Sequence, residues 1–149
     1  MEKLKGVKFL IIHHTQRPND TIDSLRDYHT KKRHFEDIGY HYVIGNSINT
    51  KDGKIYKTRL EKYKGAHAVQ VNKNSLGIAL IGNFDKAFPT EKQFNSLLKL
   101  LKELIKKYKI PTKKFIGHNK IKDVAKTCPG KNFDMTKLRK ILASSKKFI

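Results

Sequence analysis

A chain of 149 residues with 38% hydrophobic residues can bury one sizeable core, so we expect a single domain over residues 1–149 and no separate binding domain. Its 33 Lys and Arg against 13 Asp and Glu give a net charge of +20, which favours polyanionic partners. No apolar run approaches the roughly 20 residues of a membrane span, and the charged first residues do not resemble a secretory signal, so we expect synthesis in the cytoplasm.

The basic charge alone does not choose a partner. Nucleic acid, an anionic membrane surface and the anionic wall polymers of bacteria would all attract a surface of this sign. Lysines are spread along the whole chain and form no compact basic and aromatic stripe, so we expect no specific nucleic acid partner. The alternative is that many of these lysines simply form a solvated face.

The first part of the chain is predicted to hold three strands and one helix. The strands cover residues 7–14, 39–45 and 54–58. Asn19 or Asp20 can cap the helix, which would run to about Phe35. The dipeptide Asp52-Gly53 predicts the turn between the second strand and the third.

The second part adds two strands and two helices. The strands cover residues 75–82 and 115–118. Thr90 and Gln93 form a capping box for a helix with one apolar face that ends near Lys109, and Asp134 can cap a final helix. Strands and helices alternate in part, which predicts an α/β domain: a central mixed β-sheet of about five strands covered by helices.

A cysteine and three histidines suggest a metal site. Cys128 is the only cysteine and lies ten positions after His118, while an apolar strand ends in His13 and His14. Adjacent strand residues point to opposite faces, so only one of this pair can face the site, and alternation does not say which. Two imidazoles and one thiolate form a three-ligand zinc set with a fourth position for water, as in catalytic zinc sites. The pattern therefore predicts a zinc hydrolase.

The alternative is that these residues are ordinary ones. A lone histidine is often a surface or core residue, and a buried free cysteine can be a small hydrophobe. Here, however, His13 and His118 each end an apolar strand, and the neighbours of Cys128 are polar and turn-forming. We therefore favour the metal site.

Six segments in the same order resemble the type 2 N-acetylmuramoyl-L-alanine amidases, the family of phage lysozyme-type amidases and peptidoglycan recognition proteins. The resemblance runs from about Phe9 to Leu138 and is carried by residues 12–15 (Ile-His-His-Thr), 37–44 (Asp-Ile-Gly-Tyr-His-Tyr-Val-Ile), 65–68 (Gly-Ala-His-Ala), 74–84 (Asn-Ser-Leu-Gly-Ile-Ala-Leu-Ile-Gly-Asn-Phe), 117–118 (Gly-His) and 126–130 (Lys-Thr-Cys-Pro-Gly). It implies Zn²⁺ bound by His13, His118 and Cys128. It also implies hydrolysis of the amide between N-acetylmuramic acid and L-alanine in bacterial peptidoglycan.

The resemblance also implies further site residues. Tyr40 matches the active-site tyrosine of the family, and Lys126 matches the catalytic lysine of the lytic phage branch. A groove for the glycan and its peptide would be lined by His67, Asn72 and Asn74. The spacing of ten positions between the second histidine and the cysteine is longer than in the phage-type pattern, so the loop before Lys126 is longer.

The resemblance favours a monomeric endolysin that acts on the cell wall after release, from a phage, a prophage or a chromosomal autolysin gene. In the absence of a separate wall-binding domain, we expect the +20 charge to hold the enzyme on anionic wall polymers or on the membrane surface. Two other functions remain: a catalytically silent peptidoglycan-binding module of the same fold, and a basic nucleic-acid-binding protein.

Overall fold

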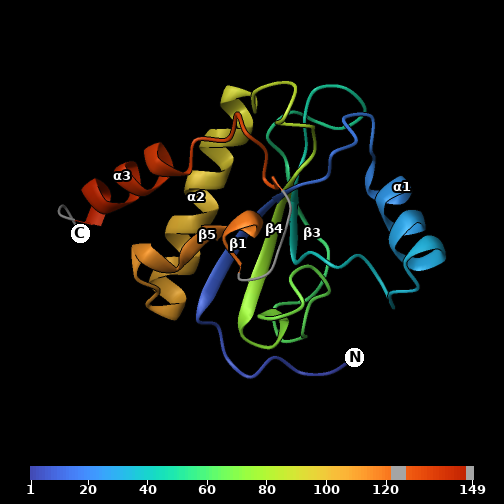
Figure 1. Ribbon diagram of the computed structural model, residues 1–149, viewed down its shortest axis with the longest axis horizontal. Helices are drawn as coiled ribbons and strands as arrows, with labels where there is room; N and C mark the ends of the chain where they lie inside the picture. Colours follow the sequence, from blue (N-terminus) through green and yellow to red (C-terminus); the bar gives the residue numbers. More distant parts are fainter. Residues whose placement is uncertain (122–126, 147–149) are drawn as a thin grey trace.

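A mixed sheet lies at the centre of the protein (Figure 1), whose computed structural model describes residues 1–121 and 127–146. Its five strands follow the order β3-β2-β4-β1-β5. Three neighbouring pairs are parallel, and β2 and β3 are antiparallel. The strands are β1 (Phe9–His14), β2 (Tyr42–Ile44), β3 (Ile55–Lys57), β4 (Ser75–Leu80) and β5 (Phe115–Gly117). The predicted α/β class and mixed sheet are confirmed, with strand ends within a few residues of those expected.

The sequences of β1 and β4 are apolar on both faces because both strands lie inside the sheet, with neighbours on each side. Strands β1 and β4 pair in parallel along their whole length, from Phe9 beside Ser75 to His14 beside Leu80. Every residue of β4 is buried, as is all of β1 after Phe9. Parallel strands that are covered on both sides need apolar residues at every position, so the usual alternation disappears.

Helices cover the two faces unequally. Helices α2 (Glu91–Tyr108) and α3 (Met135–Lys146) lie on one side of the sheet, and α1 (Ile22–Asp27) lies on the other (Figure 1). The larger core joins even-numbered residues of β1 and β4 to α2 and α3. The odd-numbered residues of β1, which include His13, therefore face the side that α2 and α3 leave open. No helix in the described part of the chain combines the length and apolar character needed to cross a membrane.

The start of α1 differs from the prediction. Thr21 is the N-cap, because its hydroxyl accepts a hydrogen bond from Ser24 N at 3.0 Å and the Ser24 hydroxyl accepts one from Thr21 N at 2.8 Å. Asp20, one of the two expected caps, instead accepts a hydrogen bond from the Ser24 hydroxyl. The helix continues as one π-helical turn (Tyr28–Lys32) and ends before Phe35. The reciprocal bonds of a capping box satisfy two terminal N–H groups at once, which favours the later start.

The capping box of α2 is present as predicted, and it also ties the helix to the sheet. Thr90 caps the helix and Gln93 completes the box. The buried Gln93 side chain also donates hydrogen bonds to Ile81 O at 2.9 Å and Ile44 O at 3.3 Å. For α3, Asp134 accepts a hydrogen bond from Lys137 N at 2.9 Å.

Glu61 joins the sheet to α2 through a cluster of hydrogen bonds. Its carboxylate accepts hydrogen bonds from the hydroxyls of Tyr42 and Tyr108, and Lys107 Nζ donates to it at 3.0 Å. Burial alone would raise the pKa of Glu61, but these hydrogen bonds outweigh burial and hold the pKa below its ordinary value of 4.5.

We expect Glu61→Gln to lower the free energy of unfolding at pH 7 by about 1.5–3 kcal/mol, the range for hydrogen bonds to a charged group. Folding lowers this pKa, so ionised Glu61 contributes stability above pH 4.5 that is lost as the pH falls through the lowered pKa. Urea unfolding at several pH values should show that the difference in free energy of unfolding between wild type and variant becomes smaller below pH 4.5. The control is Glu103→Gln, at an exposed position of α2. A difference in free energy of unfolding that does not change with pH would contradict a stabilising role for ionised Glu61.

Candidate metal centre and its cleft

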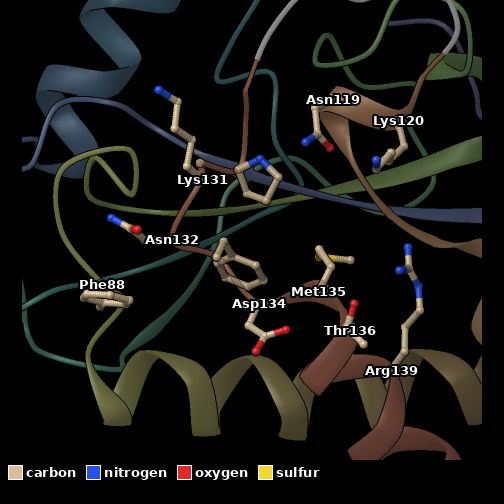
Figure 2. Close-up of a pocket in the computed structure, with 12 residues that line it drawn as sticks. Phe88, Asn119, Lys120, Lys131, Asn132, Asp134, Met135, Thr136 and Arg139 are labelled. Carbon is tan, nitrogen blue, oxygen red and sulfur yellow. The ribbon is translucent and has the colours of Figure 1, made fainter.

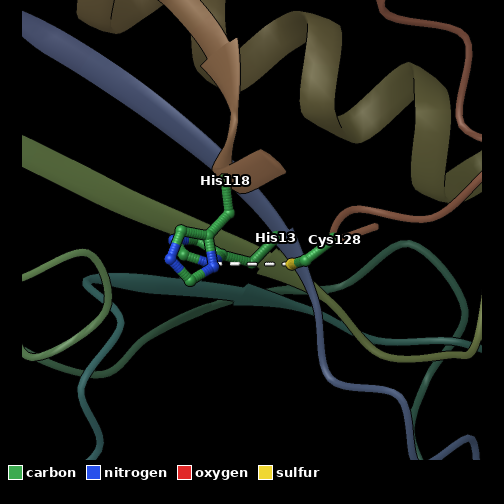
Figure 3. Close-up of side chains that lie close together, drawn as sticks. All are labelled: His13, His118 and Cys128. Carbon is green, nitrogen blue, oxygen red and sulfur yellow. Dashed lines mark hydrogen bonds between the residues drawn. The ribbon is translucent and has the colours of Figure 1, made fainter. Parts of the chain in front are cut away.

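The sheet register brings two histidines from distant segments side by side. Ile12 of β1 pairs with Gly117 of β5, so His13 and His118 follow at neighbouring positions. Their ring centroids lie 4.6 Å apart. Cys128 approaches from the segment before α3, and the ligand atoms of the three residues all lie within 4.8 Å of one another (Figure 3).

The three side chains fit a tetrahedral zinc ion. Cys128 Sγ lies 3.7 Å from His13 Nδ1. With Zn–N near 2.1 Å and Zn–S near 2.3 Å, a tetrahedral angle places the nitrogen and the sulfur about 3.6 Å apart. Two imidazoles and a thiolate suit zinc chemically, and three protein ligands leave a fourth position for water or substrate. The donor set and its open fourth position therefore fit a catalytic zinc site.

His14 lies on the other face of β1 and is not part of the cluster. Its Nδ1 accepts a hydrogen bond from Phe84 N at 3.0 Å, and its ring packs on the Phe84 ring at 5.8 Å. Burial lowers the pKa of His14, although the Asp85 carboxylate opposes the shift. The structure thus selects between the two histidines that strand alternation left open.

The backbone around Cys128 holds the thiol in place. His14 N–H points at Cys128 Sγ at 3.4 Å, a contact that favours the thiolate. Asn119 N donates to Cys128 O at 2.7 Å and ties the two ligand-bearing segments together. A Cβ atom on Gly117 would lie 2.6 Å from Pro129 Cδ, so only glycine permits this close approach.

Tyr40 lies in the cleft beside the cluster, in a cavity of about 590 Å³ that His13, His118 and Cys128 also line. Its ring centroid is 5.0 Å from that of His13. Its carbonyl oxygen accepts hydrogen bonds from the Thr58 hydroxyl at 2.6 Å and from Arg59 N, which fix the backbone. Burial raises the pKa of Tyr40, so its hydroxyl keeps its proton at neutral pH and can donate a hydrogen bond.

Two arginines that the sequence did not single out line the same cleft. Arg17 lies over the Tyr28 ring at 4.3 Å, and Arg33 lies over the Phe35 ring at 5.3 Å. Among the described residues that line the cleft, none is acidic. Asp20 already pairs with the Arg17 guanidinium, through contacts of 2.8 and 3.2 Å, so the uncompensated positive charge of this wall comes mainly from Arg33. Nothing local distinguishes these two among 33 basic residues, so no sequence signal could have selected them.

Of the three residues predicted to line the groove, two line the cleft and one lies elsewhere. His67 and Asn72 line the cleft, but Asn72 Oδ1 accepts hydrogen bonds from His67 N and Ala68 N of its own loop. Asn74 lies apart from the other two, and its groove role stays a prediction. It immediately precedes Ser75, which pairs with Phe9 in the parallel pair β1–β4, so it lies at the end of the sheet opposite His13. It is not among the residues that line the cleft.

His67 is buried and makes a contact that was not expected. Its Nδ1 lies 2.9 Å from His13 Nε2, and burial lowers its pKa well below the ordinary value.

Lys126, the predicted catalytic lysine, lies outside the described residues, and its role stays a prediction.

The comparison with protein families agrees with this geometry. The family described as N-acetylmuramoyl-L-alanine amidase matches residues 3–131. Peptidoglycan-recognition protein 2 of Holotrichia diomphalia is 37% identical over 123 residues, which cover 76% of this chain and 63% of the relative. The N-acetylmuramoyl-L-alanine amidase of Homo sapiens is 29% identical over 134 residues, 82% of this chain and 22% of that protein. The chain thus spans less than two thirds of the length of these relatives.

Solved structures show the same fold. The endolysin N-acetylmuramoyl-L-alanine amidase LysCS from Clostridium intestinale URNW superposes with a TM-score of 0.81 at 34% identity, over 92% of this chain and 84% of that one. Drosophila peptidoglycan recognition protein SD superposes with a TM-score of 0.77 at 29% identity, over 89% of this chain and 80% of that one.

Proposed function

Because the chain belongs to the N-acetylmuramoyl-L-alanine amidase family, we propose that it is a zinc-dependent enzyme that hydrolyses the amide between N-acetylmuramic acid and L-alanine in peptidoglycan. The observation that carries this proposal is the cluster of His13, His118 and Cys128 with zinc-like spacing, open to a cleft. Three protein ligands with an open fourth position are typical of catalytic zinc sites, which favours an enzyme over a silent binding module.

A zinc ion held by these three ligands would lower the pKa of a bound water to about 7 and polarise the scissile carbonyl. Tyr40, which lines the cleft, would donate a hydrogen bond from its hydroxyl to the reacting oxygen or would orient the attacking water. Lys126 would add a positive charge near the developing oxyanion. Arg33 would bind a carboxylate of the stem peptide and so orient the substrate, while Asp20 holds Arg17 beside it.

The first experiment is digestion of purified peptidoglycan by the protein, with and without a chelator. We expect new L-alanine amino termini without new reducing sugar ends, a loss of this activity after chelation and its return when zinc is added. If the metal is bound but no L-alanine termini appear, the substrate assignment is wrong. If the protein binds peptidoglycan but neither metal nor hydrolysis is found, it is a silent binding module, as its similarity to recognition proteins allows.

We also propose that the enzyme is a monomeric endolysin, made in the cytoplasm and acting on the wall after release. The similarity to a clostridial endolysin amidase supports the endolysin role. The +20 charge would hold the enzyme on anionic wall polymers. A second hollow, of about 480 Å³ beside the start of α3, contributes basic residues to that surface: Lys120, Lys131 and Arg139 line it, together with Asp134 (Figure 2).

Attachment to the wall should weaken with salt. The Debye length falls from about 10 Å at 0.1 M to about 3 Å at 1 M, which screens exposed charges. We expect co-sedimentation with cell walls to fall over this range, and to fall also when the anionic polymers are removed. Reversing Lys120 and Lys131 to glutamate should release more protein than reversing Lys102 and Lys106 on the exposed face of α2, because a hollow concentrates like charges on one polymer segment. Attachment that is insensitive to salt would contradict the proposal.

A further inference from the structure

The contact between His13 and His67 assigns the two ring nitrogens of the metal ligand. His13 Nδ1 faces Cys128 Sγ at 3.7 Å, while His13 Nε2 lies 2.9 Å from His67 Nδ1. A neutral imidazole that binds a metal through Nδ1 must carry its proton on Nε2. That proton then lies between His13 and His67, and His67 Nδ1 must accept it.

We infer that His67 is a positioning residue that accepts the Nε2–H hydrogen bond of His13 and thereby holds this ligand in the orientation and tautomer that bind zinc. The inference rests on the proposed zinc site and goes beyond it. It also replaces the expected role of His67 as a groove residue, because both ring nitrogens have partners inside the protein.

Ser75 completes the chain of hydrogen bonds. His67 Nε2 lies 3.3 Å from the hydroxyl of Ser75, the fully buried first residue of β4. A proton on His67 Nε2 can be donated to this hydroxyl, which leaves His67 Nδ1 with a lone pair for His13. Each partner thus selects the tautomer of the next one, as in sites where an outer hydrogen bond orients a metal-binding histidine.

The surroundings of His67 leave its ring little freedom. A Cβ atom on Gly77 of β4 would lie 2.6 Å from His67 Cγ, and one on Gly65 would lie 2.6 Å from His67 Cδ2. The His41 ring packs edge-on against the His67 ring at 5.8 Å, and His41 Nδ1 accepts a hydrogen bond from Gly77 N. The two glycines therefore form a slot that holds the imidazole flat against the sheet, with Nδ1 directed at His13.

Replacing His67 should weaken zinc binding without removing a ligand. We expect His67→Leu to lower zinc affinity about 10–100-fold, the usual cost of losing an outer hydrogen-bond partner. His67→Asn, whose side-chain oxygen can stand near the position of Nδ1, should retain most of the affinity. The matched control is His29→Leu, which removes another buried histidine that lines the cleft but accepts its hydrogen bond from Gly39 N. It should leave zinc affinity unchanged.

Two measurements test the inference. Titration of the metal-free proteins with zinc against a chromophoric chelator gives the affinities, and thermal unfolding of the same samples shows whether each variant is folded. Nitrogen-15 NMR of zinc-loaded wild type, labelled at histidine, should show His13 protonated at Nε2, and this measurement needs no variant.

The outcomes separate the inference from the proposed function. Equal zinc affinity in folded His67→Leu and wild type, or a His13 proton on Nδ1, would overturn the inference and leave the zinc site standing. A wild-type protein that binds no zinc would overturn the proposed function, and the inference with it.

Discussion

Replacing Cys128 by serine is expected to abolish both stoichiometric zinc binding and amide hydrolysis. The serine hydroxyl keeps its proton at neutral pH and offers zinc a much poorer ligand than a thiolate. Only His13 and His118 would remain of the three-residue cluster. The loss of zinc affinity should exceed the roughly 10–100-fold cost of losing an outer partner. Metal content after dialysis and release of L-alanine termini measure the two effects.

The single cysteine provides an internal control for this prediction. Cys128 is the only thiol in the chain, so reaction with a thiol reagent reports on one site. Bound zinc should protect the thiol of wild type, and removal of the metal should expose it to reagent. If Cys128→Ser retains one zinc per chain after dialysis, Cys128 is not a ligand and the proposed site is wrong.

Replacing Tyr40 by phenylalanine should lower kcat by about 10²–10⁴-fold, the usual contribution of a positioned proton donor or acceptor, while zinc remains bound. The variant lacks only the hydroxyl. Its ring would still pack against the cluster of Leu25, Ile38, Val43 and Ile81 and against the His13 ring, so the fold and the metal site should be unchanged. Turnover and metal content of the same preparation test both parts.

Tyr56→Phe is the matched control for this substitution. Tyr56 packs on the same apolar cluster as Tyr40 but is not among the residues that line the cleft. It should keep wild-type turnover. A wild-type rate in Tyr40→Phe would show that Tyr40 is a core aromatic residue and has no part in the chemistry.

The sequence by itself determined the fold class and the elements whose signals are local. The α2 capping box depends on Thr90 and Gln93 alone, and the structure shows it as predicted. The apolar runs of β1 and β4 predicted buried strands because every position along them is covered. His118 and Cys128 stood out because His118 ends an apolar strand and the neighbours of Cys128 are polar and turn-forming.

Tertiary structure decided everything that depends on which segments meet. The face of β1 that α2 and α3 leave open carries His13 and not His14, and the parallel register of β1 and β4 puts Asn74 at the opposite end of the sheet. The hydrogen bond between His13 and His67 joins residues 54 positions apart. Such contacts depend on sheet order and register, which arise from burying the whole core together, so no short segment of the sequence carries them.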